Sequence, residues 1–219
     1  MKNLPLSIAL LCLSAGALAS SLSVSVVDKE GKPVLDAVVI VLPANKSVLP
    51  ALPLSGQATI VQEKMQFIPN VTLVPVGAKL GFINNDPWDH HVRSSPAGMG
   101  LFNATHVGFE LRLEGKSETK PAKPVEVTLE KAGALSANLL GCFIHGSMRG
   151  YVYASESPWA AKTNAEGLAT FDGLPEGAAQ VKLWQADQLI DLPMQNLALT
   201  ASPGKLGLQL SVVPRRRRG

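Results

Sequence analysis

Short apolar runs with a two-residue period are the feature that most constrains how this chain can fold. Residues 22–26 alternate apolar side chains with serines, and residues 206–212 repeat the same alternation. No window of helical length carries a sustained apolar stripe, and 19 glycines and 16 prolines interrupt the sequence of 219 residues. A period of two bounded by turn residues is typical of strands with one buried face. We therefore predict an all-β protein with one large core or two small ones.

The same pattern predicts where strands and loops lie. We expect a hairpin over about residues 22–42, followed by a loop over 43–56 that is rich in Pro, Ala, Leu and Ser. Residues 94–123 are expected to be irregular. Further strands are expected at 79–84, 125–129, 135–142, 150–154 and 206–212.

The N-terminus indicates export. Residues 1–19 combine one positive charge, a short apolar run and a small-residue ending, which is typical of a cleaved secretory signal peptide and implies a periplasmic protein. Cys12 lies inside this segment, so Cys142 is the one cysteine of the mature chain. A single cysteine is a free thiol, an intermolecular bridge or a metal ligand. No later segment is long and apolar enough to span a membrane.

The formal net charge of +3 is concentrated at the C-terminus, in the four arginines of residues 215–218. Without these and Lys2, 15 basic residues face 17 acidic ones, so the body of the chain is nearly neutral. Nucleic acid is excluded as a partner, because phosphate binding needs a basic face. The basic tail, residues 214–219, either contacts acidic lipids or an acidic partner or stays solvated.

One seven-residue stretch carries three groups that bind soft metal ions. It runs from Cys142 to Met148 and holds a thiol, the imidazole of His145 and a thioether. Two adjacent histidines, His90 and His91, lie upstream. Two His, one Cys and a weak axial Met are the ligand set of a blue-copper site, whereas Met is a poor ligand for zinc. The pattern therefore predicts one type 1 copper ion.

The motif and the segment before it resemble those of the amicyanins, within the plastocyanin-like cupredoxins. The resemblance covers about residues 62–155 and rests on the spacing Cys-x-x-His-x-x-Met-Arg-Gly over residues 142–150 and on upstream Ile83, Asn84, Asp86, His90 and Val92. It implies a Greek-key β-sandwich over residues 57–157 in which the metal ligands are His90, Cys142, His145 and Met148.

Two features of the chain bear on that ligand set. Successive strand residues face opposite sides, so only one of His90 and His91 enters the site. The family pattern implies His90, with His91 at the position where family members carry Asn, and His91 stays the alternative. The interval of 52 residues between His90 and Cys142 is longer than in small cupredoxins, and Leu140 replaces an aromatic residue that usually precedes the cysteine.

Residues 158–213 form a second predicted unit. Gly-x-x-x-Phe over 167–171, followed by Leu-Pro-Glu-Gly over 174–177, resembles the prealbumin-type or carboxypeptidase-regulatory β-sandwich. The resemblance extends to exported proteins of a methylamine-utilisation family, which couple a cupredoxin domain to such a C-terminal β-module. Residues 20–56 either stand as a separate hairpin and loop or belong to this C-terminal lobe.

These features together favour a periplasmic electron carrier. The resemblance implies a redox protein partner such as a c-type cytochrome or a periplasmic dehydrogenase. The same ligands also suit a protein that binds and hands on copper without relaying electrons, and the C-terminal lobe also suits an envelope-binding module. We do not expect an enzyme, because four protein ligands leave no open metal position for a substrate.

Overall fold

The protein is all-β, as its sequence predicts. The structure, a computed structural model, describes residues 19–97, 108–119, 121–129 and 137–215, and it contains no helix in these ranges. None of these residues therefore forms a helix that could cross a membrane. The expected signal peptide lies outside the described residues except for Ala19, and residues 216–219 of the basic tail also lie outside them.

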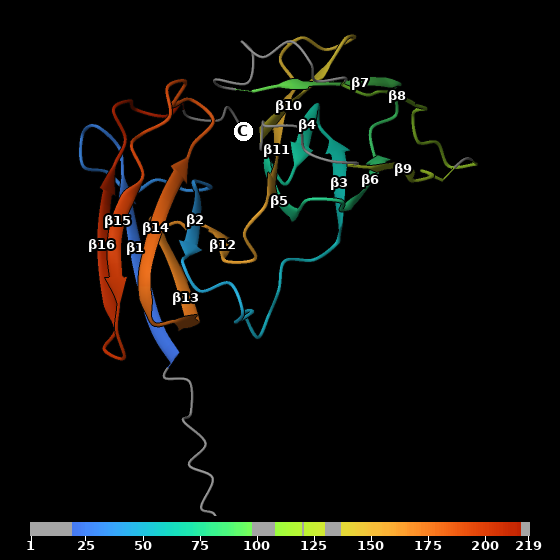
Figure 1. The fold of residues 1–219 in the computed structure, drawn as a ribbon. Helices are drawn as coiled ribbons and strands as arrows, with labels where there is room; N and C mark the ends of the chain where they lie inside the picture. Colours follow the sequence, from blue (N-terminus) through green and yellow to red (C-terminus); the bar gives the residue numbers. More distant parts are fainter. Residues whose placement is uncertain (1–18, 98–107, 120, 130–136, 216–219) are drawn as a thin grey trace, which may run out of the picture.

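Nine strands form the lobe that carries the predicted metal ligands, here called the site lobe (Figure 1). Its core holds fully buried side chains from both sheets, among them Phe82, Leu140 and Val152. One sheet has the order β5 (Val71–Pro75), β11 (Arg149–Ser155), β10 (Ala137–Cys142), β7 (His90–Pro96) and β8 (Glu110–Leu113). The other has the order β4 (Gln66–Ile68), β3 (Gln57–Glu63), β6 (Lys79–Asn84) and β9 (Val125–Thr128).

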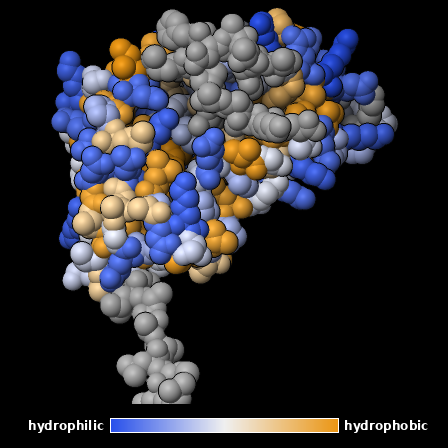
Figure 2. All heavy atoms as spheres, in the orientation of Figure 1, coloured by the Kyte–Doolittle hydropathy of each residue, from blue (hydrophilic) through white to orange (hydrophobic). Residues whose placement is uncertain are grey.

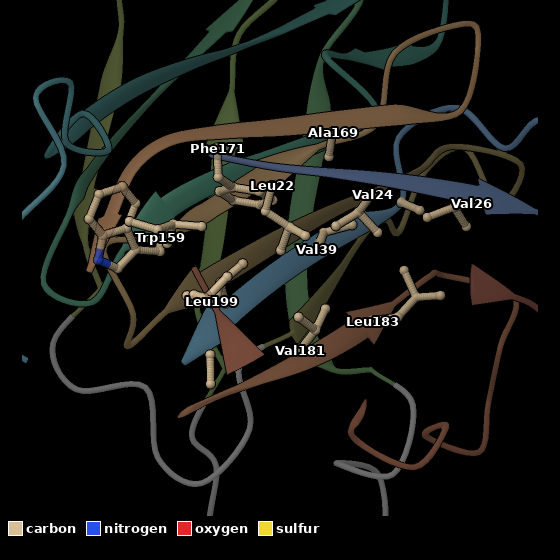
Figure 3. Close-up of a cluster of buried hydrophobic side chains, with 14 of the residues drawn as sticks. Leu22, Val24, Val26, Val39, Trp159, Ala169, Phe171, Val181, Leu183 and Leu199 are labelled. Carbon is tan, nitrogen blue, oxygen red and sulfur yellow. The ribbon is translucent and has the colours of Figure 1, made fainter. Parts of the chain in front are cut away.

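The remaining seven strands form a second lobe. Its core gathers apolar side chains from β1, β2, β13 and β14, as Figure 3 shows. One sheet has the order β13 (Leu168–Pro175), β1 (Ala19–Val27) and β16 (Gly204–Gln209). The other has the order β12 (Ala160–Lys162), β2 (Val38–Pro43), β14 (Gly177–Trp184) and β15 (Gln195–Leu199).

The predicted hairpin over residues 22–42 is wrong. Its two strands, β1 and β2, do not pair with each other and lie in opposite sheets of the second lobe. β1 pairs in parallel with β16 and antiparallel with β13. Alternating side chains identify a strand and its buried face but not its partner, so sequence neighbours were paired in error. The domain boundaries at residues 57 and 157 stay predictions.

The prediction that residues 94–123 are irregular is also wrong in part. β7 continues to Pro96, and the short strand β8 pairs with its first half. β8 has four residues, Glu-Leu-Arg-Leu, of which only Leu113 is buried. A run this short and this charged carries little periodic signal. Residues 98–107 lie outside the described part of the chain.

The two lobes stand side by side and share an apolar junction (Figure 1). Tyr151 and Tyr153 of β11 contact the ring of Trp184 of β14, with centroid distances of 5.8 and 5.3 Å. Lys162 of the second lobe donates to the carbonyl of Val71 at 2.8 Å. The face in Figure 2 mixes hydrophobic with hydrophilic residues over both lobes. The junction therefore fixes the sheet that carries β10 and β11 against the second lobe.

Candidate metal centre

Three potential metal ligands meet at one end of the site lobe. His90 is the first residue of β7, Cys142 is the last residue of β10, and His145 lies in the turn before β11. The Cys142 Sγ lies 3.6 Å from His90 Nδ1 and 3.7 Å from His145 Nδ1, and the two nitrogens are 3.1 Å apart. His90 and Cys142 are buried, while His145 is half-buried. The antiparallel pairing of β7 with β10 brings the two strand ends together.

These separations fit a metal ion bound by the three side chains. For metal–nitrogen bonds of about 2.05 Å and a metal–sulfur bond of about 2.3 Å, a tetrahedral arrangement separates two nitrogens by about 3.3 Å and a nitrogen from sulfur by about 3.6 Å. The observed 3.1, 3.6 and 3.7 Å are close to these values. Two imidazoles and one thiol thus already lie at the mutual distances that a bound ion requires.

Asp86 orients the ring of His90. Its Oδ2 lies 2.9 Å from His90 Nε2, and both side chains are buried. A carboxylate only accepts hydrogen bonds, so Nε2 carries the proton and Nδ1 presents its lone pair to the site. This is the carboxylate–histidine arrangement that fixes the ligating nitrogen in metal proteins.

Two backbone groups hold Asp86 in its charged form. Burial raises the pKa of this carboxyl, but hydrogen bonds from the Met65 N–H, from His90 and from the Lys64 N–H together keep the pKa below its ordinary value. The Lys64 N–H donates to Oδ1 at 2.6 Å, and the Met65 N–H donates to Oδ2 at 3.0 Å. Asp86 is therefore an ionised acceptor fixed by the β3–β4 turn.

Hydrogen bonds and one close packing contact hold the segment between β6 and β7 in place. Asn84, fully buried, donates to the carbonyls of Trp88 and Glu114 at 2.8 and 3.1 Å. The Gly115 N–H donates to Asp89 at 2.9 Å. A Cβ on Gly115 would lie 2.4 Å from the carbonyl oxygen of Pro87, so only glycine fits there. These contacts hold the turn that delivers His90.

Met148 lies close to Cys142 and His145 in sequence and shares a core cluster with Cys142. Its side chain is 1% exposed and belongs to the same apolar cluster as Cys142. Its N–H donates to the carbonyl of His145 at 3.0 Å, which closes the turn before β11. A buried thioether next to a buried thiol suits a weak axial ligand.

His91 faces away from the three residues. Its Nε2 lies 3.6 Å from Glu110, and its ring packs against Phe143 with centroids 4.9 Å apart. Its backbone carbonyl accepts the Phe143 N–H at 3.0 Å, so the two loops are joined here. The structure thus brings His90 and not His91 together with Cys142 and His145.

Three exposed apolar side chains belong to the loops that carry the candidate ligands. Trp88, Phe143 and Ile144 are 43%, 53% and 55% exposed. The Trp88 ring lies 6.4 Å from the ring of half-buried His145. Sequence reasoning missed the contact between Asp86 and His90, although the acid stood in the matched pattern. It also missed Gly115, because nothing local marks its close approach to Pro87.

Comparison with known proteins gives limited similarity. No family model matches the chain, and no curated protein matches it. An oxidised amicyanin variant is 18% identical, with a TM-score of 0.35, over 53% of this chain and 99% of its own. A reduced amicyanin variant is 23% identical, with a TM-score of 0.32, over 51% and 100%.

A purple cupredoxin from Nitrosopumilus maritimus is similar to a comparable extent. It is 18% identical, with a TM-score of 0.31, over 45% of this chain and 99% of its own. TM-scores of this size do not establish a shared fold. The description of the metal centre therefore rests on the strand pairing and the distances given above.

Proposed function

We propose that the protein is a periplasmic type 1 copper protein that carries single electrons between redox partners. The observation that carries this proposal is the convergence of His90 Nδ1, His145 Nδ1 and Cys142 Sγ within 3.7 Å of one another. Buried Met148 would be the axial ligand. This set of two imidazoles, one thiolate and one thioether suits copper in both oxidation states. When bound, copper supplies the one-electron couple.

The residues of the chain prepare the site in three ways. Asp86 fixes the tautomer of His90, and the bonds from the β3–β4 turn hold Asp86 in place. The apolar core excludes water from Cys142. The strand ends of β7 and β10 are joined by the register of the sheet. A site held this rigidly changes little when an electron arrives or leaves.

The half-buried edge at His145 is the proposed route for the electron. His145 is the ligand nearest the surface, and exposed Trp88, Phe143 and Ile144 lie around it or next to it in sequence. Transient redox encounters use small interfaces, which a modest apolar edge can provide. The proposed partner is a redox protein such as a c-type cytochrome or a periplasmic dehydrogenase. Export rests on the signal-like residues 1–19.

Copper titration of the purified mature chain tests the proposal. We expect one equivalent of Cu(II) to produce the visible thiolate-to-copper absorption and a narrow hyperfine splitting in paramagnetic resonance. Reversible voltammetry and fast self-exchange would support electron transfer, whereas rapid delivery of copper to an apo acceptor would indicate copper handling. A protein that stays colourless with bound copper would refute the type 1 assignment.

A further inference from the structure

Gln62 is a buried polar residue outside the proposed set of metal ligands. It lies on β3, its side chain is 0% exposed, and both its amide oxygen and its amide nitrogen lack a hydrogen-bond partner among the described residues. Burying an unpaired polar group costs about 1–3 kcal/mol. The surroundings of an amide that is unpaired at both polar atoms should therefore show what offsets the cost of its burial.

Strand pairing places Gln62 in the interior of the site lobe. It stands opposite Phe67 in the antiparallel pair of β3 and β4, so the two side chains share one face of the sheet. Phe67 packs across the sandwich against Gly150, where an added Cβ would lie 2.7 Å from the Phe67 Cβ. Gly150 follows Met148 by two residues, so this part of the core lies close to the end of the loop that carries Met148.

The neighbouring backbone places Gln62 at the metal end of that core. Two residues further on, the Lys64 N–H donates to Asp86, which binds His90. The Gln62 carbonyl accepts the N–H of Asn85, one residue before Asp86. Gln62 is thus the last inward-facing residue of β3 before the turn that holds the carboxylate.

We propose that the Gln62 amide lies beside the axial position of Met148 and tunes the metal centre, an inference that rests on the proposed copper function. No protein group among the described residues binds the amide by a hydrogen bond, so its oxygen would be available to a copper ion bound at the site. An oxygen dipole stabilises the higher charge of Cu(II) more than that of Cu(I). The potential of a blue-copper site depends on the axial group and on the polarity around the sulfur. Gln62 therefore lowers the potential relative to an apolar residue of the same size.

Gln62→Leu tests the inference through two readouts. The thermal midpoint of the metal-free protein should rise, because replacing an unpaired buried amide by an apolar group of similar shape removes its desolvation penalty. The reduction potential should also rise, with a severalfold increase in the ratio of Cu(I) to Cu(II) affinity. A tenfold change in that ratio corresponds to about 59 mV for one electron.

Thr72→Val is the matched control. Thr72 is also buried, and its side-chain oxygen likewise lacks a hydrogen-bond partner in the described part of the chain. It lies on β5 opposite Val152, four residues beyond Met148. Four strand residues span about 13 Å, so its hydroxyl is remote from the centre. Its replacement should raise the thermal midpoint and leave the reduction potential unchanged.

The outcomes separate this inference from the proposed function. A coloured wild-type protein whose Gln62→Leu variant keeps the wild-type potential and spectrum would overturn the inference alone, and a buried water would then account for the amide. A colourless wild-type protein would overturn both. A Gln62→Leu variant with a raised potential beside an unchanged Thr72→Val variant would establish the role of Gln62.

Discussion

Asp86→Asn tests the most specific claim about the centre, that a carboxylate fixes the tautomer of His90. The substitution keeps the size of the side chain but replaces one acceptor oxygen by an NH2 group. Asp86 accepts three hydrogen bonds, from the Lys64 N–H, the Met65 N–H and His90 Nε2. At least one of these donors must then face the new NH2 group.

The expected losses of stability and of copper affinity follow from these contacts. A hydrogen bond to a charged group contributes about 1.5–3 kcal/mol, so the loss of one bond and the new mismatch should destabilise the metal-free protein by about 2–4 kcal/mol. For a chain of this size, each kcal/mol lowers the thermal midpoint by about 2–4 °C. If the NH2 group donates to Nε2, the His90 proton moves to Nδ1 and blocks the ligating atom. Copper affinity should then fall about 10–100-fold.

Calorimetry of the metal-free protein and competitive copper titration measure the two effects. Asp89→Asn is the matched control, because Asp89 lies three residues away, is more exposed, and an asparagine there keeps an oxygen that can accept the Gly115 N–H. It should leave copper affinity nearly unchanged. An Asp86→Asn variant with wild-type copper affinity would refute the tautomer argument even if its thermal midpoint fell.

Three other perturbations have defined outcomes. Cys142→Ser should remove the visible copper absorption, and a chelator should lower the thermal midpoint of the copper-loaded wild type but not of this variant, because copper at 100 times its Kd adds about 2.7 kcal/mol. Burial and then the charge of Asp187 raise the pKa of Tyr151 above its ordinary value, although the positive charges of Arg149 and Arg215 oppose this rise. Its contribution to stability is therefore present below about pH 10 and falls as pH rises through the folded pKa. Denaturation between pH 9 and 11 should show this fall in the wild type and a smaller one in Tyr151→Phe. Trp184→Ala should cost about 3–5 kcal/mol by denaturant unfolding, since the ring is buried at the lobe junction, whereas Trp88→Ala, at an exposed ring, should cost far less.

The sequence predicted the all-β class, and the structure brings together three of the residues that it singled out, His90, Cys142 and His145. The two-residue period can be recognised from local sequence alone. The strand β6 was also predicted from local sequence, and its predicted bounds at residues 79 and 84 agree with the structure. Strand alternation also implied that only one of His90 and His91 enters the site, while the family pattern favoured His90. Both predictions depend on short-range geometry.

What the sequence missed depends on contacts between distant residues. One of the two partners of β1 is β16, which lies at the other end of the chain, and no local pattern indicates that pairing. Asp86 stood in the matched segment, but its hydrogen bonds come from the β3–β4 turn, 21 and 22 residues earlier. The unpaired amide of Gln62 is visible only when its surroundings are known.

The lobe junction gives the second lobe a physical role at the centre. β10 ends at Cys142 and β11 begins directly after Met148, so the predicted ligand loop is held between these two strands. The inner faces of both strands line the site-lobe core, while their outer faces place Ala137 and Tyr153 in the junction. Any tilt of this sheet would move the loop ends that set the ligand separations. The second lobe, packed on the outer face through Trp184, therefore restrains the sheet on the side opposite the core and, with it, the loop that carries the candidate ligands.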